Sequence, residues 1–164
     1  MIERSYEERL SSNRTEALFI FLTIVFAALL YWRLRAVGIG ALAIVLLFFA
    51  LFFLFYSLNY RSLLIRMTGD ALILKFGIFT WTIAYDNIQD CYLCETSLWR
   101  IGGAGIHFTW IRGNYRAFFN FLEYPRVVVV LKEKKGPVKE VAFSTTRAET
   151  VKRVIEDSTG ERSG

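Results

Sequence analysis

Histidine, cysteine and proline are scarce in this 164-residue chain, which has one histidine, two cysteines and two prolines. Two cysteines cannot build a framework of several disulfides, and so few prolines exclude a proline-rich low-complexity chain. Charge is also scarce, because 21% of the residues are Asp, Glu, Lys or Arg whereas 54% are hydrophobic. This composition is too apolar for an ordinary small soluble domain.

Two long uncharged runs account for the apolar character. They cover residues 17–32 and 36–60, and the short sequence Arg33-Leu34-Arg35 separates them. At ~1.5 Å per helical residue the second run reaches roughly 37 Å, enough to cross a hydrocarbon core of ~30 Å. The first run reaches ~24 Å and needs snorkelling polar residues at its ends. The sequence therefore predicts a transmembrane helical hairpin over residues 17–60.

The two spans of this hairpin are expected at about 17–35 and 37–60, with Gly38 and Gly40 in or near a tight turn. Buried helices of a soluble protein would be apolar on one stripe, whereas these runs are apolar all round. A signal peptide fits poorly, because the preceding residues 1–16 carry three Arg and four Glu. We therefore expect residues 1–16 to form a separate segment before the hairpin.

Basic residues near the spans predict the orientation. Six flank the hairpin on the side of the two chain ends, and two lie in its turn: Arg4, Arg9, Arg14, Arg61, Arg66 and Lys75 against Arg33 and Arg35. Since cytoplasmic segments carry the excess of Lys and Arg, both termini are expected on the cytoplasmic side. The net charge of +5 also favours anionic surfaces as neighbours.

The rest of the chain has the pattern of one β-rich domain, expected at residues 61–158 and followed by a short tail at 159–164. Strand patterns alternate with turn residues, at residues 63–67, 71–76, 80–85, 126–132 and 138–143. The last element changes period: Thr146 and Glu149 have the spacing of a capping box, and Ala148, Val151 and Ile155 share one helical face. An amphipathic helix is therefore predicted before Gly160.

Several stretches of this domain resemble the bacterial pleckstrin-homology-like (PH-like) domains found in membrane-flanked proteins. They are the sequences MTGDALILKFG at 67–77, IAYDNIQD at 83–90, WRIGGAG at 99–105 and FSTT at 143–146. The resemblance covers most of residues 61–157. It implies a strongly bent seven-stranded sheet or partial barrel with a C-terminal helix plugging one end, and a place at the bacterial plasma membrane.

One stretch combines basic and aromatic residues without any acidic one. Residues 96–122 hold three arginines and seven aromatic side chains. Six of these ten residues are candidates to face lipid or a partner: Trp99, Arg100, Trp110, Arg112, Tyr115 and Arg116. Arginine can bind phosphate through two hydrogen bonds, and Trp and Tyr favour the interface between water and lipid. The alternative is that most of these aromatic residues fill the core of the domain.

Groups suited to catalysis are few. Cys91 and Cys94 form a CxxC motif, which can be a redox pair or half of a zinc site. In a strand, however, residues three apart point to opposite faces, and one histidine with no second CxxC cannot complete four zinc ligands. We expect two reduced cysteines, no catalytic residues, no metal and no cofactor.

The leading prediction is thus an α+β membrane protein that is not an enzyme: a two-helix transmembrane hairpin followed by a PH-like bent sheet or partial barrel with a C-terminal helix. Its expected partners are the lipid bilayer and a membrane or cytoplasmic protein. Nucleic acid is disfavoured, because no recognised motif is present. Two alternatives stay open, a membrane-tethered thiol oxidoreductase using the CxxC pair and an accessory subunit of a membrane transport or envelope complex. The sequence leaves the oligomeric state open.

Overall fold

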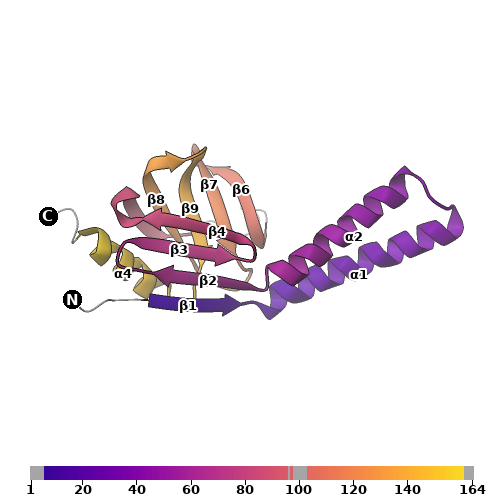
Figure 1. Ribbon diagram of the computed structural model, residues 1–164, viewed down its shortest axis with the longest axis horizontal. Coiled ribbons are helices and arrows are strands. Elements are labelled where there is room, and N and C mark those ends of the chain that lie inside the picture. Colours follow the sequence, from indigo (N-terminus) through magenta and orange to yellow (C-terminus); the bar gives the residue numbers. More distant parts are fainter. Residues whose placement is uncertain (1–5, 96, 98–102, 161–164) are drawn as a thin grey trace. The chain divides into compact units, whose positions relative to one another are not determined.

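The structure is a computed structural model that describes residues 6–95, 97 and 103–160. The chain is α+β and divides into two compact units. The helical unit is Ser12–Arg61, and the sheet unit joins the residues before Ser12 to those after Arg61. Figure 1 shows both units coloured along the chain.

The helical unit is a hairpin of α1 (Asn13–Ala36) and α2 (Ala41–Asn59). Ser12 caps α1, since its hydroxyl accepts a hydrogen bond from the Thr15 backbone N–H at 3.0 Å. Both helices are long and apolar enough to span a membrane. The predicted spans need one correction: the second helix begins at Ala41 rather than at residue 37, because Gly38 turns the chain with a φ of 87°.

Aromatic side chains hold the two helices together. Phe19 contacts Tyr56 with ring centroids 5.4 Å apart, and Phe26 stacks on Phe49 at 5.2 Å. At the base of the hairpin, Arg61 forms an ion pair with Glu16. The hairpin thus has aromatic contacts between its helices and an ion pair at the end that is continuous with β1 and β2.

A four-stranded sheet includes a strand that precedes the hairpin. Its order is β1-β2-β3-β4, formed by β1 (Tyr6–Ser11), β2 (Ser62–Met67), β3 (Ala71–Phe76) and β4 (Phe79–Ala84). β1 pairs antiparallel with β2 over its whole length. The expectation of a separate segment at residues 1–16 is therefore corrected. Because β1 pairs with β2, the hairpin is an insertion between two paired strands. β1 also covers the edge that β2 would otherwise expose.

A five-stranded sheet forms the rest of the domain, in the order β5-β8-β9-β7-β6. Its strands are β5 (Ile88–Leu93), β6 (Gly105–Ile111), β7 (Asn114–Asn120), β8 (Arg126–Lys135) and β9 (Val138–Ser144). A 3₁₀ turn, η1 (Tyr85–Asn87), joins the two sheets along the chain. All pairings are antiparallel except that of β7 with β9. The described residues thus form nine strands, where the family resemblance implies seven.

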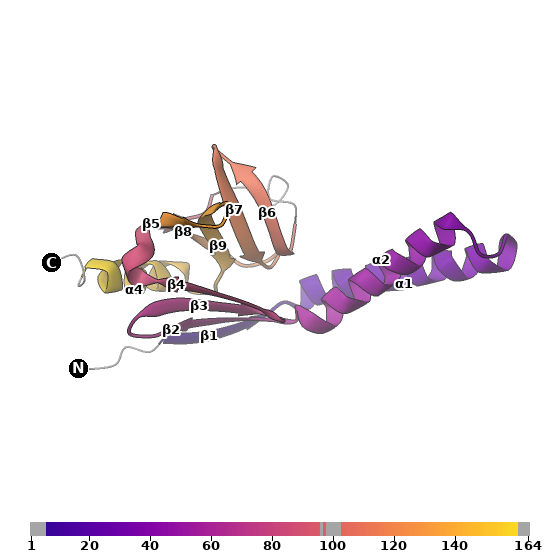
Figure 2. The same cartoon turned by 45° about the horizontal axis from the view of Figure 1, so that its top comes forward.

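The two sheets share one core. Phe76 of β3 contacts Phe121, which follows β7, with ring centroids 5.1 Å apart, and Trp81 of β4 lies 6.0 Å from Phe119 of β7. Fully buried residues come from both sheets, among them Leu63, Ile65, Leu74, Val127, Val129, Val141 and Phe143. Figure 2 shows β6 and β7 extending away from the four-stranded sheet beyond this shared core.

The predicted C-terminal helix is confirmed as α4 (Ala148–Gly160), which packs against β5 and buries Val151 and Ile155. Among the described residues, no hydrogen bond joins Thr146 and Glu149 as the predicted capping box would require. The Thr146 hydroxyl and backbone N–H instead donate to the Glu8 carboxylate of β1. These hydrogen bonds connect the residues just before α4 to the first strand.

Candidate functional site

A groove of about 980 Å³ lies between the end of β5, the turn of the β6–β7 hairpin and α4. Its lining is mixed in character and includes Tyr92, Leu93, Glu95, Ser97, Trp110, Ile111, Arg112, Arg116 and Lys152. Three of these side chains are cationic and one is anionic. We call this region the β5–β7 groove.

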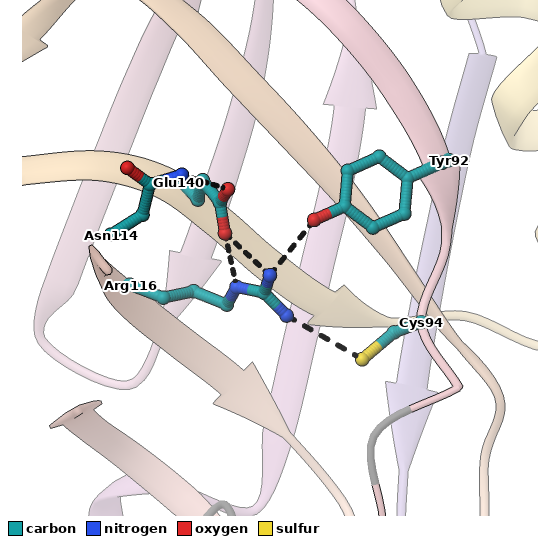
Figure 3. A network of polar contacts seen from close by, with 5 residues as sticks. All are labelled: Tyr92, Cys94, Asn114, Arg116 and Glu140. Atoms are coloured by element: carbon teal, nitrogen blue, oxygen red, sulfur yellow. Dashed lines mark hydrogen bonds and ion pairs between the residues drawn. The ribbon is translucent and has the colours of Figure 1, made fainter. Parts of the chain in front are cut away.

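One wall of the groove is a buried ion pair with polar neighbours (Figure 3). The Arg116 Nε donates to Glu140 Oε2 at 2.6 Å, and the exposed fractions of the two side chains are 3% and 7%. Asn114 Nδ2 donates to the other oxygen of Glu140 at 2.7 Å. The strands explain this meeting, because β7 runs parallel to β9 and Arg116 is in register with Glu140.

The other guanidinium nitrogens of Arg116 point toward β5 (Figure 3). One donates to the Tyr92 hydroxyl at 2.8 Å, and the other lies 3.9 Å from the Cys94 Sγ. Burial raises the pKa of Tyr92 above its ordinary value, so the phenol stays neutral and accepts this hydrogen bond. Because a buried charge is costly unless paired, the network is a fixed wall of the groove and not a set of free cations.

Beneath the network lies a small apolar cluster. Phe118, Val128 and Ala142 are fully buried, and Ile111 packs against them together with Tyr92 and Cys94. The ring of His107 stacks on Phe118 with centroids 5.1 Å apart. Tyr92 and Ile111, which pack against this cluster, also line the groove, so part of the groove lining is backed by apolar side chains.

The rim of the groove is exposed and cationic. Arg112 and Gly113 form the two-residue turn of the β6–β7 hairpin, with φ values of 49° and 85°. Such a turn favours Asn-Gly, so an arginine at its first position costs backbone free energy. Beside it, Trp110 is 68% exposed and lies 5.2 Å from the Tyr115 ring.

The structure separates the six residues predicted from sequence. Arg112 and Trp110 are exposed at the rim, and Tyr115 is half-buried against Trp110. Arg116 is buried and paired with Glu140, so its guanidinium does not face solvent as a lipid-binding cation would. Trp99 and Arg100 lie outside the described residues.

Sequence reasoning missed Glu140, Asn114 and Lys152. Glu140 has a recognisable signal, because it shares the period-2 face of β9 with Val138 and Ala142 and is thus an acidic residue at an inward position. Asn114 and Lys152 have no such signal, since turn and helix-surface positions are polar in most proteins.

The two cysteines lie at different depths and are both free. Cys91 is buried in β5, where burial raises the pKa of its thiol to about 12. Cys94 follows β5 and is half-buried beside Arg116. A nucleophilic redox cysteine requires a lowered pKa, so the Cys91 thiol is in the environment of an inert cysteine.

His107 is also placed in an apolar environment. Burial, with a smaller effect of the nearby Arg126 charge, lowers the pKa of His107 to about 4. Its Nε2 has no hydrogen-bond partner among the described residues. Within that same part of the chain, no group of three His, Cys, Asp or Glu side chains could hold a metal ion. The groove offers a ligand charge, hydrogen-bonding groups and aromatic surface.

Comparison with known proteins adds no relative. No protein-family model matches the chain, and none of the curated proteins matches it.

Proposed function

We propose that this protein is a membrane-anchored binding module without catalytic activity, whose β5–β7 groove binds an acidic segment of a protein partner. In this proposal the helical hairpin crosses the bacterial plasma membrane, and the PH-like sheet domain lies on the cytoplasmic side. The observation that carries it is the open groove itself, with its cationic rim, its exposed tryptophan and the apolar side chains of Leu93 and Ile111 in its lining.

The hairpin supports the membrane anchor. Most of its large apolar side chains are exposed in the isolated chain, including Phe21, Ile24, Leu47 and Phe48. A soluble protein rarely leaves so much contiguous apolar surface in water. Helices that are apolar all round, as these are, gain most by burial in hydrocarbon.

The rim supports an acidic ligand. Arg112 and Lys152 border the groove together with the paired Arg116, and Glu95 is the acidic side chain that lines it. Arg112 occupies a turn position with a positive φ that Asn would suit better, and its charge faces the groove rim. Trp110 adds a large apolar contact of the type enriched at binding sites.

A protein ligand is favoured over lipid because the rim lies far from the point where the chain joins the hairpin. The chain enters and leaves the hairpin at Ser11 and Ser62, which pair with each other. The Tyr124 hydroxyl, in the β7–β8 connection, bonds to the Ser11 carbonyl at 2.8 Å. Arg112 is at the opposite end of β7, a seven-residue strand of roughly 23 Å. The covalent connection to the hairpin is therefore at the other end of this strand.

Site-specific photo-crosslinking in native membranes tests this proposal. The full chain would carry p-benzoylphenylalanine in place of Trp110, and a matched chain would carry it in place of the exposed Glu7 of β1. We expect a discrete protein adduct from position 110 and not from position 7. Arg112→Asn, which suits the turn, and Lys152→Gln should each reduce the adduct several-fold, because each removes a cation from the rim.

The charge control is Lys134→Gln, an exposed lysine of β8 that does not line the groove. It should leave the adduct unchanged. Adducts with lipid alone, or a protein adduct equally reduced by all three charge changes, would overturn the assignment of the groove to an acidic protein segment.

A further inference from the structure

The β3–β4 turn lies at the same end of the four-stranded sheet as the two points where the hairpin joins it. Ser11 pairs with Ser62. In the next row across the sheet, Leu63 pairs with Phe76, and Phe76 pairs with Phe79. The turn residues Gly77 and Ile78 are thus one step beyond the last paired row. This end of the sheet we call the attachment end.

The connections between the hairpin and the attachment end are short. One residue, Ser12, separates β1 from α1, and two residues separate α2 from β2. With at most ~3.6 Å per residue, Ser62 lies within about 11 Å of the last residue of α2 along the chain. If α2 ends at the membrane interface, the attachment end is held within about 11 Å of it.

The turn at this end carries exposed apolar side chains. Ile78 is 64% exposed and Phe79 is 52% exposed. In the described part of the sheet unit, only Phe108 and Trp110 are other large hydrophobic residues that are exposed. Gly77, with a φ of 60°, makes the tight turn possible; Ile78 follows it in the turn, and Phe79 is the first residue of β4.

Two basic residues lie further into the sheet than the β3–β4 turn. Lys75 and Arg9 both pair with Leu64, so they lie in one row across the sheet, a single pair inward from the Leu63–Phe76 row. Both are exposed. An apolar tip followed by a row of cations matches the order of acyl chains and anionic headgroups in a leaflet.

We infer that Ile78 and Phe79 insert into the interface of the leaflet from which the hairpin emerges, as a second membrane contact that orients the sheet domain. This inference rests on the proposed anchoring of the hairpin in a bilayer. The occupant of this surface is the lipid leaflet itself, because the short connections bring that leaflet, ahead of any other partner, to the attachment end.

Fluorescence quenching by lipids tests the inference on the full chain reconstituted in vesicles of phosphatidylcholine and phosphatidylglycerol. A polarity-sensitive dye would be attached to Phe79→Cys in a Cys94→Ser background, and the lipids would carry a spin-label quencher. The matched control is Gly69→Cys, in the β2–β3 turn at the opposite end of the same sheet, where an added Cβ meets open space. A second control, Leu51→Cys, lies on the exposed surface of α2.

We expect the dye at position 79 to be quenched several-fold more than the dye at position 69, with emission shifted to the blue. Strong quenching at position 51 with equal, weak quenching at 79 and 69 would overturn the inference while leaving the membrane anchor intact. Absence of quenching at position 51 would reject the anchor, and the inference with it.

Discussion

The Glu140 carboxylate is held by three donors, one from Asn114 and two from Arg116. Both charges are almost fully buried, so their mutual attraction must offset a desolvation penalty of several kcal/mol per ion. The pair therefore stabilises the fold only while both partners are present. The Arg116 guanidinium also lies 5.7 Å from the centre of the Phe118 ring, which adds a cation–π contact.

Arg116→Ala is expected to destabilise the full chain by about 3–5 kcal/mol, because it leaves the Glu140 charge buried without a cation. Denaturant unfolding in detergent, followed by near-UV circular dichroism, measures the loss. Arg112→Asn is the matched control at the exposed end of the same hairpin and should be no less stable than the natural chain, because Asn suits the turn. An Arg116→Ala chain as stable as that control would show that the ion pair is not formed.

At the scale of elements, β1 ties the start of the chain to its C-terminal region. Glu8 of this strand accepts hydrogen bonds from the Thr145 hydroxyl at 2.5 Å and from the Thr146 backbone N–H at 2.9 Å. Its neighbour Glu7 faces solvent and pairs with Arg66 at 2.8 Å. A fragment that begins after the hairpin lacks β1 and exposes the edge of β2, so experiments on the sheet domain need the intact chain.

Glu8→Ala is expected to cost about 1.5–3 kcal/mol of unfolding free energy at neutral pH, because several hydrogen bonds to a charged group are lost. Glu7→Ala should cost about 0–1 kcal/mol, as for an exposed ion pair. Burial alone would raise the pKa of Glu8, but the hydrogen bonds from Thr145 and Thr146 outweigh it and lower the pKa below 4.5.

The pH dependence of this tie has a definite sign. A carboxylate with a lowered pKa in the folded state contributes stability above its ordinary value of 4.5, and that stability is lost as the pH falls through the folded pKa. The stability difference between the natural chain and Glu8→Ala should therefore shrink below pH 4.5. A difference that is constant from pH 7 to pH 3 would contradict a role for the ionised carboxylate.

For the whole molecule, the insertion of the hairpin between paired strands constrains topology. β1 and β2 belong to one sheet, so both ends of the hairpin must lie on the same side of any membrane that it crosses. The basic residues near these ends favour the cytoplasmic side. The turn at Gly38–Gly40 is then the part that reaches the other side.

Cysteine labelling of intact cells measures this topology. In a Cys94→Ser background, Ile39→Cys in the hairpin turn, where the side chain is 88% exposed, should react with a membrane-impermeant maleimide added outside. Gly69→Cys should react only after permeabilisation. Labelling of position 69 in intact cells would reverse the proposed orientation, and release of the chain by alkaline carbonate would reject the anchor.

Local patterns in the sequence predicted much of the secondary structure. The apolar runs marked both helices, short apolar runs bounded by turn residues marked β2, β3, β8 and β9, alternation marked β4, and the face of Val151 and Ile155 marked α4. These elements depend on hydrophobic periodicity and turn residues, which are properties of neighbouring positions. The sequence did not predict β1, because its residues, YEERLS, are largely polar and an edge strand needs few apolar side chains.

The residue types alone thus established two helices able to span a membrane, a β-rich domain with a closing helix, and the basic and aromatic character of residues 96–122. Only the tertiary structure decided which of those residues face solvent. The parallel pairing of β7 with β9 placed Arg116 against Glu140 and left Arg112 at the rim, because residues 24 positions apart in sequence became neighbours in register. The tertiary structure also paired β1 with β2 across the hairpin. Strand pairing depends on backbone hydrogen bonds between distant segments, which no local pattern encodes.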